Sequence, residues 1–149
     1  MDRQDILVFL RRHRLAVQST VSPDGWPQAA VVGIVVSDDL EIFFDTLTTT
    51  RKLRNLRASP RMAMVIGWDE ETVQLEGIAD EPSGADLERL LALYLQAFPD
   101  GKERQAWPGI TYVRIRPRWL RYSDFRGAEP VIVELEGAAL EQRAGTSSS

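Results

Sequence analysis

Short strand-like runs separated by turn signals are the feature that most constrains the fold. The first two runs are joined by Ser22-Pro23-Asp24-Gly25, in which proline presets φ and glycine accepts a positive φ. Runs rich in valine and other apolar residues, connected this tightly, are typical of an antiparallel meander. The expected strands are residues 15–21, 26–36, 40–45, 61–67 and 72–80, with one or two more in 110–122 and a short one at 131–135.

Helical spacing of apolar residues interrupts this pattern in three places. Residues 2–12 and 51–58 each carry an apolar side, and residues 85–98 form the longest such segment, whereas 99–109 is expected to be a loop. The sequence therefore predicts a mainly β fold, a small antiparallel barrel of six or seven strands with two or three helices at its ends. We expect one domain over 1–142 and a disordered tail over 143–149.

Composition excludes several kinds of chemistry. The 149 residues include no cysteine and only one histidine, His13, so thiolate metal sites and multi-histidine metal sites are excluded. We expect no catalytic residue of the protein's own and no metal, and any redox chemistry would come from a cofactor. No apolar run approaches the roughly 20 residues that span a bilayer. The expectation is a cytoplasmic protein with no membrane partner.

The charge distribution points to a small anionic ligand. Net charge is −4, which disfavours a nucleic-acid partner. Residues 46–68 nevertheless hold five cations and no acid, and residues 69–88 hold eight acids and no cation. A local cationic segment in an acidic chain suits a small anion better than a polyanion.

The most informative segment is Phe43-Phe44-Asp45-Thr46-Leu47-Thr48-Thr49-Thr50-Arg51-Lys52. A strand ends, hydroxyl side chains follow, and two cations lie where a helix begins. Free amides at a helix N-terminus bind anions, and arginine and lysine add charge-assisted contacts to phosphate. An ordinary threonine-capped surface helix would show the same pattern, so these residues alone leave both interpretations open.

Three motifs in order resemble those of the pyridoxamine-phosphate-oxidase-like family of flavin-binding split barrels, over about residues 15–124. They are Gly25-Trp26-Pro27 before a strand, Phe43-Phe44-Asp45-Thr46 followed by Thr50-Arg51-Lys52, and Asn55-Leu56 followed by Ser59-Pro60-Arg61. Gly77 also falls where the family has a glycine in its next strand.

The resemblance implies a homodimer with flavin sites at the subunit interface. Thr46, Thr50, Arg51 and Lys52 would bind the phosphate or ribityl chain, and the backbone at Val31 and Val32 would lie along the ring. Gln74 would replace a glutamine that contacts the ring. Together these residues make up the predicted site.

Departures from the family pattern shape the expected function. The family's oxidases have an arginine at the position of Ala30 and a lysine at that of Val35, and the segment that grips pyridoxal phosphate has no counterpart in 118–126. We therefore expect a flavin mononucleotide (FMN)-dependent oxidoreductase acting on an unknown small molecule. The alternatives are a reductase that uses the deazaflavin coenzyme F420 and a non-catalytic flavin- or haem-binding protein.

Other polar and aromatic groups receive simpler interpretations. The four tryptophans are expected in the core or a dimer interface, with Trp107 the best candidate for a ligand contact. His13 is expected to be an exposed residue at a helix end. The arginines at 114, 116, 118 and 121 and the acids of 69–88 are expected on solvated faces.

Overall fold

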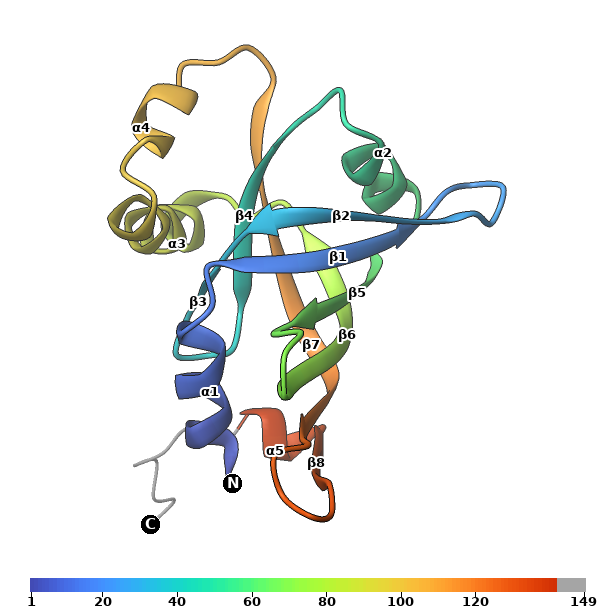
Figure 1. The fold of residues 1–149 in the computed structure, drawn as a ribbon. Coiled ribbons are helices and arrows are strands. Elements are labelled where there is room, and N and C mark those ends of the chain that lie inside the picture. The colour runs from blue at the N-terminus through green and yellow to red at the C-terminus, as the bar shows by residue number, and fades with distance from the viewer. Residues whose placement is uncertain (142–149) are drawn as a thin grey trace.

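The structure is a computed structural model, and it describes residues 1–141 (Figure 1). All eight strands of this part of the chain belong to one antiparallel sheet, in the order β2-β1-β5-β6-β7-β4-β3, with β8 paired to β7. The strands are β1 (Leu15–Val21), β2 (Pro27–Gly33), β3 (Val35–Val36), β4 (Ile42–Leu47), β5 (Arg61–Ile66), β6 (Glu71–Asp80), β7 (Ile110–Asp124) and β8 (Val131–Glu136). The helices are α1 (Arg3–Arg11), α2 (Arg51–Ala58), α3 (Gly84–Ala97), α4 (Gly101–Arg104) and α5 (Ala138–Glu141).

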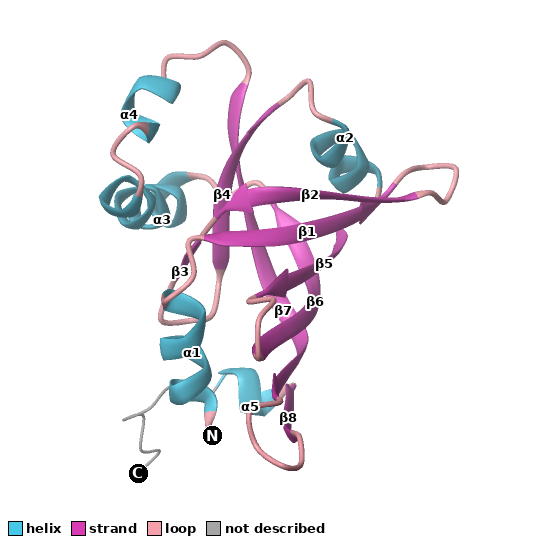
Figure 2. Ribbon diagram, in the orientation of Figure 1, coloured by secondary structure: helices cyan, strands magenta, loops and turns pink. Residues whose placement is uncertain are grey.

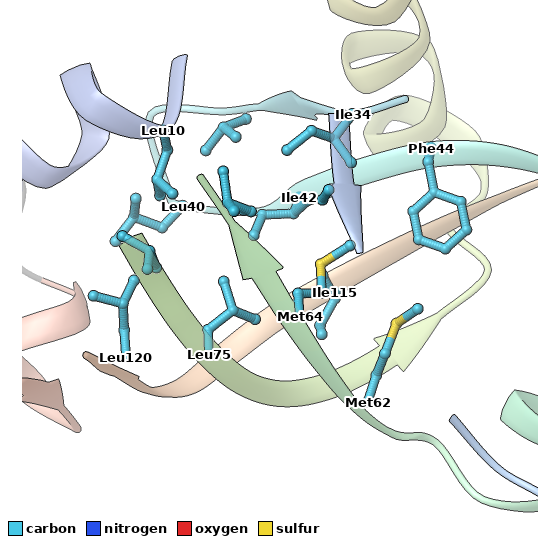
Figure 3. Packing of buried hydrophobic residues seen from close by; sticks show 14 of the residues in the cluster. Leu10, Ile34, Leu40, Ile42, Phe44, Met62, Met64, Leu75, Ile115 and Leu120 are labelled. Carbon is cyan, nitrogen blue, oxygen red and sulfur yellow. The ribbon is translucent and has the colours of Figure 1, made fainter. Parts of the chain in front are cut away.

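The sheet curls on itself to form the barrel. Strand β2 stands at one end of the strand order, yet it lies against β4 near the other end (Figure 2). This curl encloses the main core, which is built from the inward side chains of the strands and closed at one end by Ile6 and Leu10 of α1. Figure 3 shows Met62 and Met64 of β5 pointing into this core among Ile42, Ile115 and Leu75. The predicted fold class, a mainly β antiparallel split barrel, is confirmed.

A second, smaller cluster lies under α3. It contains Val35, Phe43, Leu90 and Tyr94, and the apolar side of α3 supplies its outer half. The rings of Phe43 and Tyr94 meet edge to face, with centroids 5.7 Å apart. The predicted helix over 85–98 is thus confirmed within a residue at each end, and its buried face is Leu90 and Tyr94.

The structure divides the strand expected over 26–36. Strand β2 pairs with β1, whereas β3 pairs with β4, so the chain changes partner at Ile34. Gly33 stands at this point, where a Cβ would lie only 2.9 Å from the Phe98 ring. A larger residue at this position would have to displace that ring, and apolar patterning alone does not reveal such a contact.

Two further elements differ from expectation. The segment expected to be a loop at 99–109 contains the short helix α4. The segment 110–122, where one or two strands were expected, is the single strand β7, which runs without a break from Ile110 to Asp124. Opposite Glu76 and Gly77 its pairing moves from Trp119 to Pro117, so Arg118 is the extra residue of a bulge on β7. Short elements such as β3, α4 and α5 bring the described total to eight strands and five helices, above the numbers expected. The tail predicted for 143–149 lies outside the described residues.

Candidate functional site

Thr50 begins helix α2 and fixes the position of the two cations that follow it. Its backbone is extended (φ −76°, ψ 151°), and its hydroxyl accepts a hydrogen bond from the Leu53 amide at 3.4 Å. The same hydroxyl donates to the Leu47 carbonyl at 2.9 Å. Since a hydroxyl has one proton, the 3.0 Å contact between Thr46 Oγ1 and Thr50 Oγ1 is a bond that Thr46 donates. Both threonine hydroxyls are therefore committed to building the end of β4 and the start of α2.

Asn55 joins α2 to the β1–β2 hairpin. It is buried, and its Nδ2 donates to Thr20 Oγ1 at 3.0 Å and to Gln28 Oε1 at 2.7 Å. These two bonds hold the helix beside the inner side of the hairpin, as Figure 1 shows. The cationic start of the helix is thereby set against two strands.

A pocket of about 350 Å³ lies between the helix start and the hairpin. Arg51 and Lys52 supply its cationic side, and within residues 1–141 neither forms an ion pair with an acid. The arginine is always charged, whereas burial lowers the pKa of the Lys52 ammonium below its usual range. The pocket is lined by Gln18, Thr20, Gln28, Ala29, Ala30, Arg51 and Lys52.

Gln18 is the unexpected member of this pocket. Its side chain is 2% exposed, and its Oε1 has no hydrogen-bond partner among the described residues. A buried polar atom left without a partner costs about 1–3 kcal/mol. Sequence reasoning missed this residue. The available signal was its place in β1, where Ala16, Gln18 and Thr20 alternate as the inward positions.

Comparison with known proteins shows which family this chain belongs to. Residues 3–124 match the family model described as pyridoxamine 5'-phosphate oxidase. The chain belongs to this family. A pyridoxine/pyridoxamine 5'-phosphate oxidase of Bordetella pertussis is 29% identical over 119 residues, a match that covers 75% of this chain and 55% of the relative. The chain thus spans about half the length of that curated relative.

Solved structures agree on the fold of the family. A haem-binding protein from Mycobacterium smegmatis superposes with a TM-score of 0.79 at 18% identity, covering 94% of this chain and 59% of that protein. A pyridoxamine 5'-phosphate oxidase-related, FMN-binding protein from Nostoc punctiforme superposes with a TM-score of 0.66 at 13% identity, covering 90% and 95%. At these identities the likeness establishes the split-barrel fold.

The structure brings four of the predicted site residues together. Thr46, Thr50, Arg51 and Lys52 meet at the end of β4 and the start of α2. Val31 is 59% exposed on the outer side of β2, whereas Val32 faces the core.

Gln74 lies elsewhere within the same chain. In the register of the sheet it stands opposite Val65, which leads on to Val17, and this row of side chains faces outward. Gln18 and Met64 form the adjacent row, which faces inward. Gln74 lines a separate outer pocket of about 240 Å³ beside Trp119. The subunit therefore places Gln74 on the opposite face of the sheet from Gln18.

The residues present fit the phosphate end of a family flavin. Two cations that have no acidic partner in the described part of the chain, together with a helix N-terminus, suit a phosphate, and the Gln18 oxygen, unpaired within the same part, accommodates a ligand donor. Ala30 lines the pocket without adding charge. Val35 packs against Phe43 and Leu90 in the core under α3, so its position contributes nothing to the pocket.

Arg114 corrects the expectation of a solvated arginine face. It is 5% exposed and forms ion pairs with Glu41 at 3.0 Å and with Asp80 at 2.7 Å. Asp80 belongs to the acidic segment expected to be solvated, and so does Asp86, which pairs with Arg89 at 3.1 Å. Arg116 and Arg118 are exposed as expected.

The remaining candidates lie outside the pocket. Trp26, Trp68 and Trp107 are more than half exposed, so they do not pack in the core of this subunit, and their expected place in a dimer interface stays a prediction. His13 is half-buried against Phe9, with Nδ1 3.0 Å from the Phe9 carbonyl. Among residues 1–141, no cluster of three metal-binding side chains occurs, and no helix is long and apolar enough to cross a membrane.

Proposed function

We propose that this protein is an FMN-dependent oxidoreductase acting on a small molecule. The observation that carries the proposal is the pocket at the start of α2, where Arg51 and Lys52 have no acidic partner among residues 1–141 and lie beside a helix N-terminus. Cations in that state are available to an anion, and the Asn55 bonds hold the helix in place for it. Membership of the family supports a flavin as the molecule whose phosphate is this anion.

Different residues of the site would bind the phosphate and position the binding groups. Arg51 gives a planar bidentate donor to the phosphate, Lys52 gives a point charge, and the amides at the helix start complete the anion site. Thr46 and Thr50 position these groups. When bound, the flavin supplies the hydride chemistry, and the chain orients it and excludes water from it.

We further propose a homodimer in which a second copy covers the outer face of the sheet. This face is aliphatic at several strands, and Val31, Val65 and Ile78 are 59%, 36% and 45% exposed there. Contiguous exposed apolar surface marks an interaction site, and a two-fold interface would place the same strands of two copies together. Gln74 and Trp119 would then lie at the interface.

Two other functions remain as competing proposals. A reductase that uses coenzyme F420 would need more cations for its longer anionic tail, and Arg54 is exposed one turn after Arg51 without an ion pair in the described residues. A carrier without turnover would suit a chain that has Ala30 in the pocket and Val35 in the core under α3, where the family's oxidases have cations. The likeness to a haem-binding protein makes haem a candidate ligand in that case.

Titration of the purified protein with FMN, coenzyme F420 and haem tests these proposals. We expect an FMN complex with quenched flavin fluorescence, and bleaching of its visible absorption when NADH or NADPH is added without oxygen. Binding of F420 or haem but not FMN would overturn the assigned cofactor. An FMN complex that neither nicotinamide reduces would favour the carrier.

A pair of variants tests the site itself. Replacing Arg51 and Lys52 by alanine removes two charge-assisted contacts of about 1.5 kcal/mol or more each, so FMN affinity should fall about 100-fold. Arg54→Ala is the matched control, because Arg54 lies on the same helix and does not line the pocket. Equal affinities for the double variant and the control would show that the cations do not bind the cofactor.

A further inference from the structure

In the described part of the chain, Gln18 is the residue of the cofactor pocket that has a buried side-chain polar atom without a hydrogen-bond partner. The neighbouring polar groups, Thr20 and Gln28, both accept hydrogen bonds from Asn55. Across the sheet, Gln18 stands opposite Ala30 on β2 and Met64 on β5, and neither side chain can donate a hydrogen bond. The carboxamide is therefore held in an apolar row at the edge of a polar pocket.

The position of Gln18 fixes what could satisfy it. It lines the same pocket as Arg51 and Lys52. When the two cations bind the anionic end of a ligand, the part of the ligand next to that end would therefore lie near Gln18. A carboxamide offers one acceptor and two donors, and a hydroxyl group can both donate and accept. A chain of hydroxyl groups next to a phosphate supplies such partners, whereas the phosphate ester group itself is mostly a dianion without an O–H donor at neutral pH.

We propose that Gln18 is a specificity-determining residue that binds the polyol chain of a phosphorylated cofactor. This inference rests on the proposed function, in which that cofactor is FMN and the polyol is its ribityl chain. Arg51 and Lys52 recognise the charge, and Gln18 recognises the hydroxyl groups beside it. A buried group built to hydrogen-bond a ligand hydroxyl discriminates strongly against ligands that lack it, because the protein group is then left unpaired.

The inference also predicts how the protein behaves without ligand. An apolar residue of similar size at position 18 would remove the unpaired buried oxygen, so it should raise the melting temperature of the cofactor-free protein. The same change should weaken FMN. Opposite effects on stability and on affinity are expected of a binding residue, whereas a structural residue loses both together.

The experiment compares the wild type with Gln18→Leu and with Gln18→Met, which keeps the unbranched shape should leucine fit poorly. Gln105→Leu is the matched control, because Gln105 is exposed at the end of α4 and does not line the pocket. The dissociation constant for FMN is measured by flavin fluorescence. Binding of inorganic phosphate is measured by thermal shift, which also gives the melting temperature without ligand.

We expect FMN affinity to fall about tenfold or more in both Gln18 variants, with phosphate binding unchanged and the melting temperature of the cofactor-free protein raised. Unchanged FMN affinity in these variants, while the Arg51 and Lys52 double variant loses it, would overturn the role of Gln18 and leave the proposed function standing. A wild type that binds no FMN would overturn the proposed function. Parallel losses of FMN affinity, phosphate affinity and melting temperature would assign Gln18 a structural role and overturn the inference.

Discussion

At the residue scale, the helix start separates positioning from binding. Thr46 donates its hydroxyl proton to Thr50, and Thr50 donates its own to the Leu47 carbonyl, whereas the charges of Arg51 and Lys52 face the pocket. The single sequence motif thus contains residues with two different roles, since the threonines position the helix start and the cations are available to a ligand. From each role we expect a different effect of substitution.

Removal of the Thr50 hydroxyl should act mainly on stability. Thr50→Ala deletes the N-cap of α2, which typically costs about 1 kcal/mol, and Thr50→Ser keeps the hydroxyl and should cost less. Urea denaturation measures both changes in the free energy of unfolding. A Thr50→Ala variant as stable as the wild type, but with FMN affinity lost as fully as in the Arg51 and Lys52 double variant, would place the hydroxyl on the ligand instead.

Lys52 should set an upper pH limit on cofactor binding. Burial lowers the pKa of its ammonium, so its charge is present below that pKa and is lost as pH rises through it, earlier than for an exposed lysine with a pKa of about 10.4. A phosphate ester gains its second charge near pH 6, which sets the lower limit. FMN affinity measured by fluorescence from pH 5 to pH 10 should therefore rise and then fall. In Lys52→Arg the alkaline fall should disappear, and its persistence would assign it to another group.

At the element scale, a buried ion network ties the β3–β4 turn to α3 and β7. Glu41 is 5% exposed, and burial raises its pKa, but hydrogen bonds from Arg89, Ser37 and Arg114 outweigh this effect and lower it from 4.5 to about 2. Because the folded-state pKa is depressed, the stabilisation is complete above about pH 4.5 and is lost as pH falls towards 2. The network therefore stabilises the packing of the β3–β4 turn against α3 and β7, and acid weakens this stabilisation.

Glu41→Gln should remove this acid dependence. The shift corresponds to roughly 3 kcal/mol, so the variant should lose about that much stability at pH 7 and little more between pH 4.5 and pH 2.5. Glu103→Gln, at an exposed carboxylate on α4, is the control and should follow the wild type. Denaturant titration at several pH values measures both. A Glu41→Gln variant with the wild-type slope against pH would show that the network does not set acid stability.

The sequence predicted local features of these elements better than their long-range partners. Strand β1 and helix α2 were predicted with their observed bounds, because turn residues, a threonine cap and apolar spacing are local signals. The burial of Arg114 was not predicted, because its partner Glu41 lies 73 residues away. The change of strand partner after Gly33 and the row that isolates Gln18 both depend on which strands pair and in what register, so neither could be predicted from neighbouring residues.

At the scale of the whole molecule, the barrel has an outer face that one subunit leaves uncovered. The curled sheet directs its inner side chains to the core, while Val17, Val65 and Gln74 form a row across β1, β5 and β6 on the other side. This row adjoins a second outer pocket, of about 610 Å³, that includes Arg61 and Ile78. The proposed second copy would bury these groups.

A charge on this face should dissociate the proposed dimer. Val65→Glu would bury a carboxylate in an apolar interface, where an unpaired charge is strongly disfavoured, and Val8→Glu is the matched control because Val8 is 46% exposed on α1. Sedimentation velocity should show a dimer for the wild type and for Val8→Glu, and a monomer for Val65→Glu. If the partner helps to enclose the cofactor, FMN affinity should fall with dimerisation in Val65→Glu even though Arg51, Lys52 and Gln18 are intact. A monomeric wild type that binds FMN would show instead that one subunit forms the whole site.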